Sequence, residues 1–400
     1  MKLEEKKLPK GWEVKTLGEV CDIVYGKGLP IKELKSSGYP VFGANGIIGF
    51  NDKFLFEEPQ VLISCRGAAS GKINLSPPKC YVTNNSLVLD IKKKDELDRN
   101  YLFFALNIAN KTKLVTGTAQ PQVTINNAVE LEIPLPPLPE QQAIVAKIEE
   151  LFSELENGKK ELLIAQAKLK TYRQSLLEWA FEGRLTNKNL KEGELPKGWE
   201  VTELQKICEI KRGKSKHRPR NDPSLFGGKY PFIQTGDIRN ADGGYIRKFK
   251  QTYNEKGLQQ SRLWTKGTLC ITIAANIGET AILDLDACFP DSVVGLVCNE
   301  KFLLNKYAHY FFISHKSKLE QLAPATAQKN INVDILEKVR IPLPKLNEQK
   351  QIVDDLESKL TICDEIEETI KTSIKQGEAL LQSILKKAFL GTLINKKNVT

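Results

Sequence analysis

An internal repeat is the feature that most constrains the fold of this chain. The segment LPKGWE occurs at residues 8–13 and again at residues 195–200. The longer segments LPKGWEVKTLGEVCDI and LPKGWEVTELQKICEI are identical at 10 of 16 positions. Self-similarity over a long interval is the signature of duplicated structure, so the 400 residues predict two copies of one folding unit.

Two further repeats show how far each copy extends. IPLPPLPEQQAIV (133–145) matches IPLPKLNEQKQIV (341–353) at 9 of 13 positions, and AFEGRL (180–185) is echoed by AFLGTL (388–393). The first repeat recurs after 187 residues and the later ones after 208, so the second copy has 21 extra residues in its middle. The polar segments at the two ends of the chain resemble the polar linker 186–194. This near-circular order predicts two halves related by a pseudo-twofold axis.

The middle of each copy predicts a mixed α/β (α+β) globular domain with a mostly β core. Short β-type runs (YPVFG, QVLISC and NSLVLDI; then YPFIQT, TLCITIA and SVVGLVC) are separated by Gly, Asn and Pro. Residues 101–107 and 307–315 are typical of buried helices late in each domain.

Each copy ends in a long predicted helix. Proline holds IPLPP and IPLPK extended, and apolar residues then recur at alternating spacings of four and three, which is the pattern of a coiled-coil seam. Each helix covers about 42 residues, or roughly 60 Å, and stops near Gly183 or Gly391. The predicted seam residues are Ile144, Ile148, Leu151, Leu155, Leu162, Leu169 and Leu176 in the first helix, and Ile352, Leu356, Ile366, Ile370, Leu380 and Ile384 in the second.

The simplest packing is one long antiparallel two-helix coiled coil between the two domains. The alternative, in which each helix lies across its own domain, fits the narrow apolar stripe and its charged flanks less well. The predicted divisions are a first domain at 1–138, a central helix at 139–185, a linker at 186–194, a second domain at 195–346, a C-terminal helix at 347–392 and a flexible tail at 393–400.

Composition narrows the functional classes. The net charge of +10 and pI near 9.0 favour a polyanionic partner. The 8 cysteines include no C-x-x-C pair and there are only 3 histidines, so we expect no metal site and no disulfide framework. No signal peptide and no apolar run of about 18 residues is present, which predicts a soluble cytoplasmic protein without a membrane partner.

The sequence shows no convincing active site. The segment SPPK (76–79) has Lys79 where the loop of methyltransferases that act on DNA amino groups needs an aromatic residue. GAASGK (67–72) lacks the spacing and the following Ser or Thr of a phosphate-binding loop. We therefore expect a binding protein rather than an enzyme.

Two sets of residues are candidates for DNA contacts. Basic residues suit phosphate, whereas Arg, Lys, Asn and Gln side chains can form paired hydrogen bonds with purines. Each residue taken singly is also typical of a turn or cap, and the charge run is also typical of a solvated flexible loop. The basic set is Lys211, Arg212, Lys214, Lys216, Arg218 and Arg220; the base-reading set is Asn45, Arg66, Lys72, Asn84, Asn85, Gln120 and Gln122, with Gln234, Arg239, Asn276, Gln328, Lys329 and Asn330 in the second half.

The repeated motifs, in this order over nearly the whole chain, resemble the specificity subunit of a type I restriction-modification enzyme. The resemblance implies two target recognition domains that each read one half of a split DNA site, and helices that set the spacer and dock two modification (methyltransferase) subunits. S-adenosylmethionine, ATP and Mg²⁺ would belong to those subunits and to the restriction subunits, with no cofactor in this chain. The family motifs match Trp12, Trp199, Glu140, Gln141, Glu348 and Gln349 here, but they give no base code.

Two other interpretations stay open at this point. A coiled-coil scaffold with two protein-binding heads would explain the rods but predicts binding that is indifferent to salt. An unrecognised nuclease or methyltransferase would explain the basic charge, but the missing motifs make it the least favoured.

Overall fold

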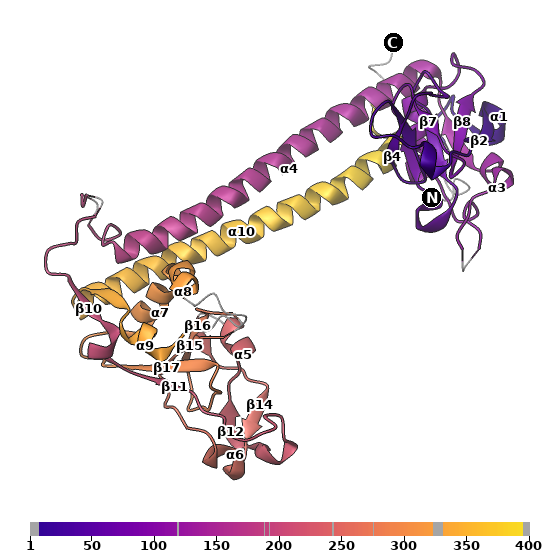
Figure 1. Cartoon of the computed structure of the whole chain (residues 1–400). Helices are drawn as coiled ribbons and strands as arrows, with labels where there is room; N and C mark the ends of the chain where they lie inside the picture. Colours follow the sequence, from indigo (N-terminus) through magenta and orange to yellow (C-terminus); the bar gives the residue numbers. More distant parts are fainter. Residues whose placement is uncertain are drawn as a thin grey trace. The chain divides into compact units, whose positions relative to one another are not determined.

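The computed structural model describes residues 8–117, 120–187, 189–191, 193–241, 244–274, 276–322 and 331–394. The chain divides into two compact units. Unit 1 takes the residues up to Leu163 together with those from Lys371 onward, and unit 2 takes Ile164–Ile370. Each unit therefore contains one mixed α/β domain and a part of each of the two long helices (Figure 1).

The domain of unit 1 is built on two small sheets. The larger has the strand order β2-β8-β5-β6 and the smaller the order β4-β3-β7. Residues Val61–Ser64 of β5 are all buried, because this central strand is covered on both faces. The predicted helix near residue 101 is confirmed as α2, which packs against β5 and β6. The elements are α1 (Leu17–Val20), β2 (Cys21–Tyr25), β3 (Tyr39–Phe42), β4 (Ile47–Asn51), β5 (Val61–Ser64), β6 (Ile73–Leu75), β7 (Tyr81–Val82), β8 (Ser86–Ile91), α2 (Arg99–Ile108) and α3 (Ile125–Val129).

The domain of unit 2 has a larger sheet with the strand order β11-β17-β15-β16-β13 and a separate ribbon of β12 and β14. Helix α7 packs against β15 and β16 and confirms the second predicted late helix. The elements are β11 (Cys208–Arg212), β12 (Phe226–Phe232), α5 (Thr235–Arg239), β13 (Tyr245–Ile246), β14 (Gln251–Tyr253), α6 (Glu255–Gln259), β15 (Leu269–Thr272), β16 (Thr280–Leu283), β17 (Val293–Cys298), α7 (Asn305–Ser314), α8 (Lys316–Leu322) and α9 (Val333–Glu337).

A two-stranded antiparallel ribbon leads into each long helix. Strand β1 (Glu13–Thr16) pairs with β9 (Glu132–Leu135), and β10 (Glu200–Glu203) pairs with β18 (Arg340–Leu343) in the same register. The first proline of each IPLP segment, Pro134 or Pro342, lies in β9 or β18, where one edge of the strand needs no amide donor. The chain then enters the helices α4 (Leu138–Phe181) and α10 (Leu346–Ala388).

A buried glutamine fixes the start of each long helix. The Gln141 side chain accepts a hydrogen bond from Asp98 N and donates to Glu96 O and Pro136 O, each at 2.8 Å. Gln349 repeats this arrangement: its side chain accepts from Leu304 N at 2.9 Å and donates to Phe302 O at 2.7 Å and Pro344 O at 2.9 Å. Both side chains are fully buried, so a three-bond connection ties each helix to the domain that precedes it.

The repeated LPKGWE segment forms a tight turn in both copies. Trp12 N donates to Pro9 O and Trp199 N to Pro196 O, each at 3.1 Å. The glycine before each tryptophan has φ near +90°, a conformation that favours glycine at this turn position. Both tryptophan rings are buried and so anchor the chain at this point.

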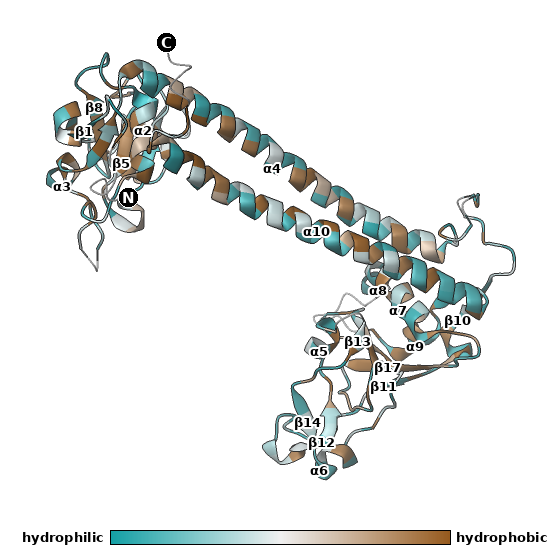
Figure 2. Ribbon diagram, turned by 180° about the vertical axis from the view of Figure 1, so that it is seen from behind, coloured by the Kyte–Doolittle hydropathy of each residue, from teal (hydrophilic) through white to brown (hydrophobic). Residues whose placement is uncertain are grey.

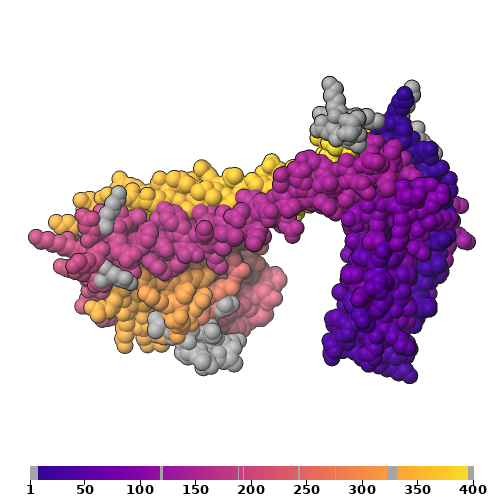
Figure 3. Space-filling model, turned by 90° about the horizontal axis from the view of Figure 1, so that it is seen from above, coloured from indigo at the N-terminus to yellow at the C-terminus, as the bar shows by residue number. Residues whose placement is uncertain are grey.

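The two long helices run antiparallel within each unit, as predicted. In unit 1 Lys159 Nζ lies 2.9 Å from Glu378 Oε1. In unit 2 Arg173 pairs with Asp364 at 2.6 Å, and the two helices lie side by side in the space-filling view (Figure 3). The core of unit 1 includes the start of α4 and the end of α10, whereas the core of unit 2 includes the end of α4 and the start of α10.

Most seam residues near the ends of the two helices are buried, whereas several nearer the middle are only partly buried or exposed. Ile144, Ile148, Leu176, Ile352, Leu356, Ile370 and Ile384 are buried, and Leu151, Leu155, Leu162 and Leu169 are partly buried. The prediction was wrong for Ile366 and Leu380, which are 44% and 47% exposed. The buried face of α10 follows Cys363, Ile370, Gly377 and Ile384, which recur every seven residues. Ile366 and Leu380 each lie three residues after one of these positions, which turns them about 60° round the helix. Apolar and polar residues alternate along both rods (Figure 2).

The seam of unit 1 opens at two glycines. Gly158 of α4 and Gly377 of α10 line the same apolar cavity of about 390 Å³, with Phe152, Leu162 and Leu381 around it. A Cβ atom added to either glycine would meet nothing within 4 Å. The helix pair is therefore under-packed at this level.

All eight cysteines are buried, as expected for small apolar residues. Burial raises the pKa of the Cys21 thiol to about 12 and that of Cys288 to about 11. Within the described part of the chain, no helix has the length and apolar character needed to cross a membrane.

Candidate nucleic-acid interface

In unit 1 the predicted base-reading residues gather on loops at the end of β5. Arg66 pairs with Gln122 in an isolated antiparallel bridge. Between them and the sheet, Cys65 N donates to Asn85 O at 2.9 Å and Val123 N donates to Cys65 O at 3.0 Å. Two of these three contacts join residues more than 50 positions apart in sequence, so the segments around Arg66, Asn85 and Gln122 form one surface.

The hairpin between β3 and β4 joins the same surface. Lys72 Nζ donates to Asn45 Oδ1 at 2.5 Å, and the Ser64 hydroxyl donates to Ala44 O. The side chains of Asn45, Arg66, Lys72, Gln120 and Gln122 are exposed, while Asn84 and Asn85 are half-buried. The structure therefore brings these seven residues together on a polar, positively charged face, and their roles toward DNA stay predictions.

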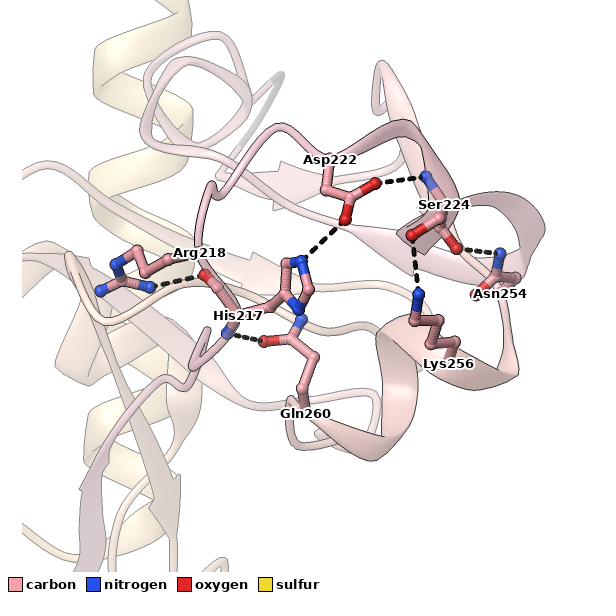
Figure 4. Close-up of polar contacts among 7 residues, drawn as sticks. All are labelled: His217, Arg218, Asp222, Ser224, Asn254, Lys256 and Gln260. Carbon is pink, nitrogen blue, oxygen red and sulfur yellow. Dashed lines mark hydrogen bonds and ion pairs between the residues drawn. The ribbon is translucent and has the colours of Figure 1, made fainter.

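Side-chain hydrogen bonds connect the basic loop of unit 2 to its surroundings (Figure 4). His217 Nε2 lies 2.8 Å from Asp222 Oδ2, and His217 N donates to Gln260 Oε1 at 3.1 Å. Ser224 N donates to the Asp222 carboxylate at 2.9 Å, and Lys256 Nζ donates to Ser224 Oγ at the same distance. The hydrogen bonds from Ser224, followed by the contact with His217, lower the pKa of Asp222 to about 2. The loop is thus closed on itself and tied to α6.

Internal ion pairs offset part of the positive charge in this loop. Arg220 pairs with both carboxylate oxygens of Asp291 at 2.7 Å, and Lys211 pairs with Glu209. The guanidinium of Arg218 donates to Ser215 O at 2.7 Å and to His217 O at 2.8 Å, and Arg212 donates to Asp291 O.

Lys214 and Lys216 differ from the paired residues. Both side chains are exposed, and among the described residues neither ammonium group has an ion pair or a hydrogen bond. These two lysines are therefore the best-placed residues of the loop for phosphate contact.

A concave surface adjoins the basic loop in unit 2. A cavity of about 500 Å³ is lined by Arg220, Gln234, Gln251 and Ser292, together with Phe226 and Phe232. Gln234 Nε2 donates to Gln251 Oε1 at 2.6 Å, so two glutamine amides face the cavity as a pair. The sequence reasoning missed Gln251, because its place beside Gln234 depends on the pairing of β14 with β12.

The other predicted residues of unit 2 are less clearly grouped. Arg239 is exposed at the end of α5. Asn276 is exposed in a turn, and its backbone oxygen accepts from the Thr272 hydroxyl. Gln328, Lys329 and Asn330 lie outside the described residues.

A Gly-Lys step begins the corresponding loop in each domain. Gly26 N donates to Ser86 O at 3.0 Å and Lys27 N to Val82 O at 3.0 Å. Gly213 and Lys214 make the same bonds to β17 and the segment before it, to Val293 O at 2.8 Å and Phe289 O at 3.0 Å. A Cβ atom on either glycine would fall 2.3 Å from a backbone oxygen, so only glycine allows this close crossing. Lys27, which is exposed, is therefore the counterpart of Lys214 in unit 1; the repeated GK pair was the signal that could have identified it.

The two faces differ in charge at a matching position. Ser64 N bonds to Lys72 O in unit 1, and Thr272 N bonds to Glu279 O in unit 2, both at 2.9 Å. Lys72 contacts Asn45, whereas Glu279 is paired with Lys316 at 2.5 Å. The same backbone position therefore carries a lysine in the first domain and a carboxylate paired with a lysine in the second.

Comparison with known proteins gives consistent matches over most of the chain. The family model described as "Type I restriction modification DNA specificity domain" matches residues 9–165 and 196–376. A putative type I restriction enzyme specificity subunit of Haemophilus influenzae is 29% identical over 93% of this chain and 94% of its own length. The EcoBI specificity subunit of Escherichia coli is 27% identical over 75% of this chain and 67% of its own length.

Solved structures show the same fold. The HsdS subunit from Thermoanaerobacter tengcongensis superimposes with a TM-score of 0.67 at 22% identity, covering 98% of this chain and 100% of that one. A chain from a study of complex assembly and conformational transition in a type I R-M system gives a TM-score of 0.72 at 23% identity, covering 97% and 100%.

Proposed function

The chain belongs to the type I restriction modification DNA specificity family, and we propose that it selects the DNA sequence on which partner subunits act. Recognition of a specific DNA sequence is the function of this family. In this proposal the chain itself is not catalytic. Each of its two domains recognises one half of a bipartite site.

One observation carries the proposal: the two domains share the same strand pairing and helix attachment, but their surfaces carry different side chains. The β1–β9 and β10–β18 ribbons have one register, and Gln141 and Gln349 make the same three kinds of bond. Lys72 and Glu279, however, stand at matching positions with opposite charge. A constant frame with variable loops suits two modules that recognise different base sequences.

The long helices suit two roles. Uninterrupted helices of 44 and 43 residues provide a fixed length along the DNA, which would set the spacer between half-sites. Their exposed apolar residues offer docking surfaces for two modification subunits. These residues are Leu163, Ile164 and Tyr172 in α4, and Ile362, Ile366 and Leu380 in α10. S-adenosylmethionine would bind to the modification subunits, and ATP and Mg²⁺ to the restriction subunits.

Mapping of methylated bases in genomic DNA tests the proposal. We expect adenine methylation at one bipartite motif in cells with the chain and its partners, and none at that motif when the chain is deleted. Replacing residues 1–138 with the matching domain of a relative should change one half of the motif and leave the other half and the modification activity intact. A chain whose complexes show no DNA sequence preference would contradict the proposal.

A further inference from the structure

The hairpin of β3 and β4 in unit 1 exposes two adjacent isoleucines. Ile47 is 55% exposed and Ile48 is 51% exposed, and both follow Asn45 and Gly46 at the hairpin tip. Strand β4 is the edge strand of its sheet and pairs with β3, while Phe50 near its far end also bridges to Lys35. Exposed apolar side chains on an edge strand are a liability for association, so a function is the better explanation for two of them together.

The tip of this hairpin is held in place at several points. Gly43 N donates to Gly46 O at 2.8 Å across the turn. The Ser86 hydroxyl donates to Gly43 O at 2.9 Å, and the Ser64 hydroxyl donates to Ala44 O. Isoleucine is branched at Cβ and has few rotamers, so both side chains are presented with little conformational freedom.

The isoleucines lie beside the polar face described above. Asn45 lies two residues before Ile47 and accepts a hydrogen bond from Lys72, which is itself exposed. Arg66 begins the turn that leads to Lys72. An apolar pair next to cationic side chains fits a ligand that offers an apolar group close to a negatively charged backbone.

The second domain has no such pair at the matching place. Tyr230 and Pro231 repeat Tyr39 and Pro40, but the chain then enters helix α5 instead of a hairpin. Ile238 on that helix is buried. The exposed isoleucines therefore distinguish the face of the first domain.

We propose that Ile47 and Ile48 recognise thymine in the first half-site by contact with its 5-methyl group. Thymine is the base that carries a methyl group in the major groove, and that groove is wide enough for a two-stranded β-ribbon. Neighbouring lysines contact phosphates and fix the position of the ribbon. This inference rests on the proposed function and adds a chemical class of contact to it.

Selection from random duplex DNA tests this contact, with the full chain copurified with its modification subunits. One library contains thymine, and the other contains uracil, which lacks only the methyl group. For the wild-type chain we expect the first half-site to select thymine at one position or more. Enrichment at that position should fall about fourfold in the uracil library, which corresponds to the loss of one buried methyl group. The second half-site acts as an internal control.

Side-chain variants link the effect to the hairpin. The double variant Ile47→Ala, Ile48→Ala should lose the preference for thymine and respond equally to both libraries, while the second half-site is retained. Ile31→Ala is the matched control, because Ile31 is 86% exposed in the same domain but lies outside the hairpin. It should behave as wild type.

The possible failures are distinguishable. If the wild-type complex selects no bipartite site, the proposed function is wrong. If it selects one, but uracil replaces thymine throughout the first half-site without loss, the methyl contact is wrong. The assignment of the methyl contact to Ile47 and Ile48 is also wrong if the double variant keeps its preference for thymine. Should the double variant not fold, the comparison of the two libraries with wild-type protein decides alone.

Discussion

Pro9 packs directly onto Gly391 at the end of α10, where a Cβ atom would fall 2.2 Å from Pro9 Cγ. Pro196 packs onto Gly183 in the same way, also at 2.2 Å. Both glycines have positive φ, +67° and +78°, as expected for a residue that ends a helix. We predict that Gly391→Ala lowers the free energy of unfolding by about 2–4 kcal/mol, because it adds a clash with proline to an unfavourable backbone conformation.

Gly11→Ala is the control for this prediction, measured by the same urea denaturation. Gly11 has φ of +91°, but a Cβ atom there would meet nothing within 4 Å. Gly11→Ala should therefore lower the free energy of unfolding only by the penalty for alanine at positive φ, about 1 kcal/mol. Equal losses for the two variants would show that the proline contact contributes nothing.

The buried glutamine at the start of each rod should be essential for stability. Gln141→Ala leaves Asp98 N, Glu96 O and Pro136 O without their partner, and we expect a loss of about 3 kcal/mol in urea denaturation. Gln349→Ala should cost a similar amount. The control Gln174→Ala removes an exposed bond to Glu178 and should change stability by no more than about 0.5 kcal/mol.

Lys214 and Lys216 should supply sequence-independent affinity for DNA. Lys214→Ala and Lys216→Ala should each reduce the slope of log affinity against log salt by about one, with a uniform loss over all sequences. Fluorescence anisotropy with unrelated duplexes at several salt concentrations measures this slope. Lys266→Ala is the control, since Lys266 Nζ lies 2.7 Å from Asp284 and is already paired. A slope unchanged by both loop variants would exclude phosphate contact there.

His309 should make stability depend on pH. Burial, followed by the charge of Lys306, lowers its pKa from 6.5 to about 4. Above pH 6.5 the histidine is neutral in both the folded and the unfolded chain, so protonation of His309 does not lower the free energy of unfolding there. As the pH falls from 6.5 towards 4, the unfolded chain binds a proton that the folded chain does not, so up to about 3 kcal/mol is lost.

The variant His309→Gln isolates this effect. It should lose less stability than wild type between pH 7.5 and pH 4.5 in urea denaturation, although its stability at pH 7.5 is lower because the bond with Thr280 at 3.0 Å is altered. Parallel pH profiles for the two proteins would contradict the assignment.

Lengthening both rods should change the DNA spacer. Seven residues inserted after Lys168 and seven after Ile370 keep the seam in register and add about 10 Å to each helix, which matches about three base pairs. Methylation mapping should show a spacer longer by that amount, or loss of recognition. Seven residues added to the linker 186–194 are the control and should leave the spacer as it was. An unchanged spacer with the helix insertions would refute the role of the helices.

The ends of each domain and the two long helices could largely be predicted, because their sequence motifs occur twice in the chain. Proline fixes the strands before the helices, and Gly183 and Gly391 mark their ends, so local chemistry alone defines the rods. The error at Ile366 had a different cause: α10 has apolar residues at 362, 363, 366 and 370, which fit two stripes. Only the partner helix, through contacts such as Arg173 with Glu367, decides which stripe is buried.

The candidate site was predictable in composition but not in charge. Turn residues such as Asn45 and Arg66 were recognised by type, and the fold brings them together. The partner of Arg220, however, lies 71 residues further along the chain, so its neutralisation by Asp291 could not be deduced from the basic run itself. Which of these residues contact bases remains a prediction.

The core of unit 1 joins Trp12 and Tyr101 with Ile384 and Phe389. The Tyr101 and Phe389 rings lie 5.2 Å apart, so the first domain is closed by residues near the end of the chain. During synthesis Phe389 follows Tyr101 by 288 residues. The first domain therefore cannot complete its core until α10 has been translated, and its apolar surface stays uncovered until then.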